Sequence, residues 1–123
     1  MFNLMKVLAD GLAAFYTDMT AVTAPSFVCA VLTEFGRRVA ENGSVGTDHG
    51  HGGAMFLLGS AVQGGRVLTD WPGLVVGQLF EQRDLKITID YRDILSEIVA
   101  ERLGNPDLGA VFPGYTPTFR GVL

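Results

Sequence analysis

The sequence predicts a small α/β protein in which a few short, mostly buried strands combine with two main helices. Continuous apolar runs of strand length occur at residues 26–32 and 54–59. Longer segments with an apolar residue at every third or fourth position occur at residues 3–20 and 91–103. The 123 residues are enough for one domain with a single core. With 48 % hydrophobic and 18 % charged residues, the composition is that of a globular protein.

The first predicted helix spans residues 3–20. Its apolar side chains recur at spacings of three and four residues and share one face of the helix. They are Leu4, Leu8, Leu12, Phe15 and Met19. Pro25 prevents the helix from continuing further along the chain.

The second predicted helix spans residues 91–103 and has clear signals at both ends. Asp90 can accept a hydrogen bond from a backbone N–H of the first turn, so it is the expected N-cap. Gly104 and Pro106 end the helix. The expected core-facing residues are Tyr91, Ile94, Leu95, Ile98 and Val99.

The apolar run at residues 26–32 is typical of a strand buried on both faces, as in a parallel sheet covered by helices. Residues 54–59 predict a second strand of this kind, and alternating residues at 85–89 predict a half-buried third strand. Strands buried on both faces need neighbouring elements, and two helices can cover only part of such a sheet. We therefore expect one partial domain over residues 1–123, completed by self-association or by a missing N-terminal portion.

The polar groups that can bind ligands are concentrated between Glu34 and Gly53. Ligands gather at the carboxyl ends of strands in open α/β sheets, which favours Glu34 and the loop that follows it. Residues 42–53 are expected to form a long glycine-rich loop that begins with the turn signal Asn42-Gly43.

Three side chains of this loop are candidate metal ligands: Asp48, His49 and His51. Glu34 could add a second carboxylate from the preceding strand. Zinc and manganese both accept such mixed oxygen and nitrogen ligands, and a flexible loop would let the neighbouring side chains converge on one ion. The alternative is a simple turn in which Asp48 bonds nearby amides and the histidines face solvent.

Two adjacent arginines, Arg37 and Arg38, could bind a phosphate, sulfate or carboxylate through their guanidinium groups. In the alternative interpretation one of them pairs with Glu34 or Glu41 and the other is solvated. Neither nucleotide-binding pattern, GxxxxGK[ST] or GxGxxG after a strand, occurs in the sequence.

Composition argues against several classes of function. A net charge of −4 disfavours nucleic-acid binding. The single cysteine, Cys29, precludes an intrachain disulfide and a cysteine-based zinc site. No apolar run approaches the roughly 20 residues of a membrane span, so we expect no membrane partner. Residues 1–6 do not have the pattern of a signal peptide.

The motif formed by Glu34–Arg38, Glu41–Gly43 and Gly46–Gly50 resembles the hallmark of a widespread bacterial family of unknown function. Further similarity extends over most of the chain, including Trp71–Leu74 and Pro113–Tyr115. Members of that family are commonly exported through the twin-arginine route. The family is placed in the alkaline phosphatase and sulfatase superfamily.

The resemblance implies that this chain is the C-terminal part of an alkaline-phosphatase-like α/β/α sandwich. It also implies that Asp48 and His49, an Asp-His pair before a glycine, are ligands of a divalent metal. The chain would then be a fragment of a metal-dependent hydrolase of phosphate or sulfate esters, inactive by itself because the nucleophile lies outside it. The alternative is a non-catalytic structural or interaction protein that self-associates through uncovered strands.

Overall fold

The computed structural model describes residues 2–22 and 26–123, so the expected helix stop at Pro25 lies outside the described residues. The α-helices are α1 (Phe2–Ala21), α2 (Tyr91–Glu101) and α3 (Leu108–Val111). The strands are β1 (Cys29–Val31), β2 (Gly36–Glu41), β3 (Thr47–Gly50) and β4 (Phe56–Leu58), and a 3-10 turn, η1, spans Val76–Gln78. The mixture of helices and short strands confirms the predicted α/β class.

The strands form two separate antiparallel pairs, β1 with β4 and β2 with β3. The expected parallel sheet with strands buried on both faces is therefore wrong. The hairpin β2–β3 is inserted between β1 and β4, and the chain returns from it in the opposite direction. Because the chain reverses, β4 can only lie antiparallel to β1, where Cys29 is opposite Leu58.

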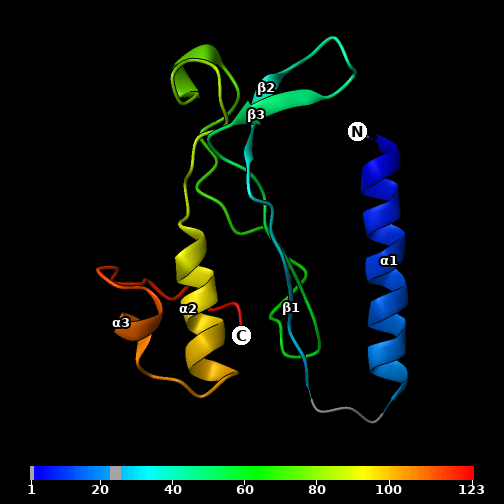
Figure 1. Cartoon of the computed structure of the whole chain (residues 1–123), viewed down its shortest axis with the longest axis vertical. Coiled ribbons are helices and arrows are strands. Elements are labelled where there is room, and N and C mark those ends of the chain that lie inside the picture. The colour runs from blue at the N-terminus through cyan, green and yellow to red at the C-terminus, as the bar shows by residue number, and fades with distance from the viewer. Residues whose placement is uncertain (1, 23–25) are drawn as a thin grey trace.

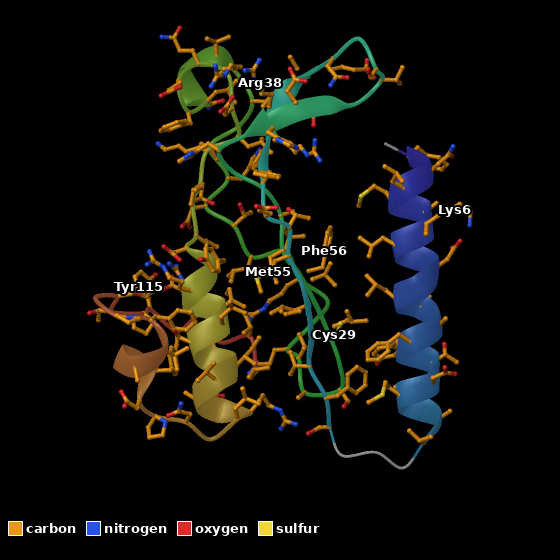
Figure 2. The ribbon with its side chains drawn as sticks, viewed as in Figure 1. Lys6, Cys29, Arg38, Met55, Phe56 and Tyr115 are labelled. Carbon is orange, nitrogen blue, oxygen red and sulfur yellow. The ribbon has the colours of Figure 1, made fainter. Side chains whose placement is uncertain are left out.

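Helix α1 confirms the first predicted helix, and it lies on the other side of β1 from α2 and α3 (Figure 1). Its apolar stripe meets the rest of the chain at two points. The ring of Phe15 packs edge-on against Phe27, with centroids 5.7 Å apart. Phe56, the first residue of β4, points toward α1 (Figure 2) and lines a small cavity together with Leu8 and Leu12. None of the twenty residues of α1 is buried.

Helix α2 confirms the second predicted helix and both of its end signals. The Asp90 side chain accepts a hydrogen bond from the Arg92 backbone N–H, and Gly104 follows the helix with a φ of +65°. The expected buried face is only partly correct. Ile94 is buried, but the other buried residues of α2 are Asp93, Ser96 and Glu97. The charged side of α2 is covered because the C-terminal segment packs on it.

Residues 85–89 do not form the expected strand. Within the described part of the chain, the only ladder contacts near them are isolated bridges at Asp84, to Arg38 and to Phe80. The segment is extended and exchanges single hydrogen bonds with the hairpin, from Leu85 N to Arg37 O and from Gly52 N to Leu85 O. The half-buried strand predicted from the alternation is therefore wrong, because no other strand of the described chain pairs along its length.

The core is small, and a large groove borders it. Ile94 and Val122 are the two buried hydrophobic residues among those described. Both line a groove of about 1280 Å³ that also reaches Phe35, His51 and Trp71. No helix in the described residues is long and apolar enough to cross a membrane. Because only Ile94 and Val122 are buried among the described hydrophobic residues, much of the apolar surface of this chain is in contact with solvent.

Candidate functional site

The candidate site lies on the hairpin β2–β3, whose turn is built around Asn42. The Asn42 Oδ1 accepts hydrogen bonds from the backbone N–H of Ser44 (3.0 Å) and of Gly46 (3.1 Å), which confirms the turn predicted there. The expectation of one long loop over residues 42–53 is wrong, because residues 47–50 form strand β3. Arg37 lies opposite His49 in the strand register.

Asp48 is held by two neighbours and remains accessible. Its Oδ1 accepts a hydrogen bond from Asn42 Nδ2 at 2.9 Å, and its Oδ2 lies 3.6 Å from Arg38 Nη1. The side chain is 54 % exposed. The carboxylate is thus neutralised by a neighbouring cation while one side of it still faces solvent.

The two histidines stack on different aromatic rings. The His49 ring lies on Phe35 with centroids 4.1 Å apart, and the His51 ring lies on Phe80 with centroids 3.8 Å apart. Both ring pairs are nearly parallel, at 15° and 13°. Stacking fixes the plane of each imidazole and leaves the ring nitrogens at its edge, where a ligand would have to approach.

Asp48 and His49 are neighbours in a strand, and such side chains point to opposite faces. They therefore do not converge on one point as they could in a loop. Among residues 2–22 and 26–123, no three His, Cys, Asp or Glu side chains lie close enough to hold a metal ion together. The described residues by themselves do not fit a complete zinc or manganese site.

The two arginines have different surroundings. Arg38, labelled in Figure 2, lies between two carboxylates. Its Nη1 is 3.6 Å from Asp48 Oδ2, and its Nε is 3.9 Å from Asp84 Oδ1. Arg37 donates from Nη1 to the carbonyl oxygen of Thr47 at 2.7 Å, and no ion pair involves it within the described part of the chain. Arg37 is therefore the cation that an external anion could reach.

Glu34 is exposed just before β2 and lines the same groove as His51. Neither arginine pairs with Glu34 or Glu41; Arg38 pairs instead with Asp48 and with Asp84. The expected grouping of Glu34 with the Asp-His pair is thus not formed by the described residues.

Asp84 is a charged residue that the sequence patterns did not indicate. It is 4 % exposed and accepts a hydrogen bond from Arg83 Nε at 2.7 Å. That hydrogen bond, with the nearby charges of Arg83, Arg38 and His51, outweighs burial and holds the pKa of the Asp84 carboxyl below its ordinary value. Asp84 binds the hairpin to the following turn through Arg38.

Two more buried carboxylates, Asp93 and Glu97, lie on α2 away from the hairpin. Burial by itself would raise the pKa of the Asp93 carboxyl, but hydrogen bonds from Thr118, Tyr115 and Arg120 outweigh burial and lower it. The only sequence signal for this pair is its spacing of four residues, which places both side chains on one face of the helix.

The chain has been compared with family models, curated proteins and solved structures. No curated protein and no solved structure matches it. The model of the family described as "Protein of unknown function (DUF1501)" matches residues 1–107, which include the whole hairpin and α2. Because this match covers most of the 123 residues, the chain belongs to the DUF1501 family.

Proposed function

We propose that this chain is an interaction module that self-associates through its uncovered strands and apolar faces. The observation that carries the proposal is the surface left in solvent, which amounts to 8360 Å². The scaling for compact monomers gives about 6,400 Å² for a mass of 13.2 kDa. The difference of about 2,000 Å² exceeds the roughly 800 Å² that one partner contributes to a standard interface.

Two features offer this surface to a second copy. β1 and β4 form a two-stranded sheet, so each strand has an outer edge without a ladder partner in the described chain. On one face of α1, Leu4 and Val7 are 77 % and 71 % exposed. An antiparallel strand edge beside an apolar helix face suits a two-fold contact, in which each copy offers the same patch to the other.

Sedimentation equilibrium tests this proposal. We expect a concentration-dependent dimer, weakened more than about tenfold when Leu4→Glu and Val7→Glu place two charges on the exposed helix face. Thr17→Glu with Thr20→Glu is the matched control, because it adds two charges three residues apart at exposed polar positions on a different face of the same helix. A chain that stays monomeric up to about 100 µM, the range in which a weak interface would still be populated, would refute self-association.

A second function is favoured by the polar side of the hairpin. Here the chain is the part of a metal-dependent hydrolase of phosphate or sulfate esters that carries Asp48, His49 and His51, and it is inactive alone. Two observations support it: Asp48 is about half exposed, and Arg37 has no ion pair in the described chain. This second proposal includes membership of the alkaline phosphatase and sulfatase superfamily, and the export from the cell that is typical of the family.

Because the described residues do not form a complete metal site, the remaining ligands would come from further protein. Two or three ligands hold an ion weakly without an ordered second shell. Arg37, opposite His49 in the register, would bind the charged group of the ester.

Metal content by mass spectrometry, with zinc and manganese titrations, tests the second function. Zinc binding at micromolar level should weaken by about tenfold or more in Asp48→Ala and in His49→Ala. Asp18 is an exposed carboxylate on α1, so Asp18→Ala is the control and should bind zinc like the parent chain. Zinc affinity that is unchanged in both variants would exclude the hairpin as a metal site, and so would a longer protein with the remaining ligands that binds no zinc.

A further inference from the structure

The charged face of α2 holds the C-terminal residues 115–123 through two buried carboxylates. Asp93 Oδ1 accepts hydrogen bonds from Tyr115 Oη (2.6 Å) and from the Thr118 backbone N–H (2.8 Å). Its Oδ2 accepts two hydrogen bonds from Arg120, from Nε at 2.9 Å and from Nη2 at 2.7 Å. One carboxylate thus binds three separate residues of the tail, which Figure 2 shows running beside α2 near the labelled Tyr115.

Glu97 binds only the backbone of the tail. Four consecutive N–H groups point at its carboxylate, at distances of 2.5 to 3.1 Å. Those of Arg120 and Gly121 reach Oε2, while those of Val122 and Leu123 reach Oε1. A φ of +64° at Gly121 turns the backbone so that all four N–H groups face the helix. Glu97 is only 1 % exposed, so these bonds replace its hydration almost completely.

The tail contributes one side chain, Val122, to the small apolar core, and the rest of its attachment is polar. Val122 is its one buried hydrophobic residue, whereas Phe119 is 45 % exposed. On its other side the tail bonds to the turn after β4, where Gln63 N donates to Val122 O at 2.9 Å and Arg66 donates to Gly121 O. The attachment is therefore mainly polar, and water can satisfy the same groups after release.

The tail contributes Val122 to the lining of the large groove. Val122 lines the groove together with Ile94, and Trp71 lies along it as well. Release of the tail would withdraw Val122 from the groove lining and uncover the two buried hydrophobic residues of the described chain, Ile94 and Val122.

We propose that residues 115–123 are a strap that closes one wall of the groove, latched by Asp93 and Glu97, and that it opens by releasing these two carboxylates while α2 stays folded. Local opening is favoured because, apart from Val122, the strap is attached by hydrogen bonds whose groups water can satisfy after release. Segments with few buried apolar contacts open at lower free energy than the core. The strap does not depend on either function proposed above.

Amide hydrogen exchange on the full chain tests the strap. In the parent chain, the amides of Thr118 and of residues 120–123 should exchange about tenfold or more slowly than in an unstructured peptide. Glu97→Gln should raise the exchange of residues 120–123 about tenfold while the amides of α2 keep their protection. Glu101→Gln, an exposed glutamate one turn further along α2, should leave both sets unchanged.

Tyr115→Phe is a second, milder variant, which removes one bond to Asp93 and should raise exchange at Thr118 selectively. Binding of an environment-sensitive apolar dye should increase in Glu97→Gln as the groove wall opens. Unprotected strap amides in the parent chain would overturn the proposal. An unchanged exchange pattern in Glu97→Gln would do so too, and so would a joint loss of protection in α2 and the strap in both variants.

Discussion

Gly52 connects the base of the hairpin β2–β3 to residues 85–86, and replacing it should loosen the candidate site. Its N–H donates to Leu85 O and its carbonyl accepts from Arg37 N, both at 2.8 Å. A Cβ built at Gly52 would lie 2.7 Å from Leu85 O and 2.9 Å from Lys86 O. Those atoms belong to the backbone and cannot rotate away, so the segments must separate.

The cost of Gly52→Ala follows from these contacts. Overpacking costs about 1–3 kcal/mol. Alanine also restricts the unfolded chain more than glycine does, which offsets about 0.4–1 kcal/mol of this cost. We expect a free energy of unfolding lower by about 1.3 kcal/mol. With an unfolding entropy of about 2.1 cal/mol/K per residue, the melting temperature should fall by about 5 °C.

Thermal unfolding followed by circular dichroism measures this difference, and Gly43→Ala is its matched control. Gly43 lies in the turn of the same hairpin, and a Cβ there would meet no atom within 4 Å. This variant should melt at the parent temperature or slightly above it. If both variants melted within about 2 °C of each other, the close packing of the hairpin against residues 85–86 would be refuted.

Three further predictions concern the charges of α2. The hydrogen bond to Asp93 raises the pKa of Tyr115 to about 12, so in an ultraviolet titration one tyrosine of the three should ionise last, and Asp93→Asn should lower its pKa. Stability linked to this group is present below pH 10 and lost as pH rises toward 12. The pKa of Asp93 is lower in the folded chain than in the unfolded chain, where it is about 3.9. The stability that Asp93 contributes is therefore present above about pH 3.9 and lost as the pH falls below it, and acid unfolding of the parent chain and of Asp93→Asn will measure this loss. Removing the N-cap in Asp90→Ala should cost about 1 kcal/mol in urea unfolding, and Asp90→Asn much less.

The sequence was sufficient to predict features that depend on local contacts. The helix α2, its cap at Asp90 and its stop at Gly104 follow from side chains that bond or shape their own neighbourhood. The turn at Asn42 is equally local, because one side-chain oxygen accepts two amides of the next four residues. These features need no information about distant parts of the chain.

The hairpin and the convergence of its ligands could not be predicted in the same way. Residues 36–41 carry two arginines and a glutamate, without the alternation that indicates a strand. They form β2 because β3 pairs with them and residues 83–85 bond alongside them. Whether Asp48 and His49 share a ligand depends on that pairing, since a strand sends neighbouring side chains to opposite faces.

The buried face of α2 shows why the uncovered surface of this chain matters. Helical periodicity predicted burial of the apolar side, yet Asp93 and Glu97 are more completely buried than Leu95 or Ile98, which are only half-buried. The charged side is stable there because the tail supplies hydrogen bonds to every carboxylate oxygen. The apolar side has no comparable cover within the described chain, although its burial would stabilise the fold by about 25 cal/mol per Å². A partner surface that covers it would gain this free energy without disturbing the strap, so association and latching can be tested as separate properties.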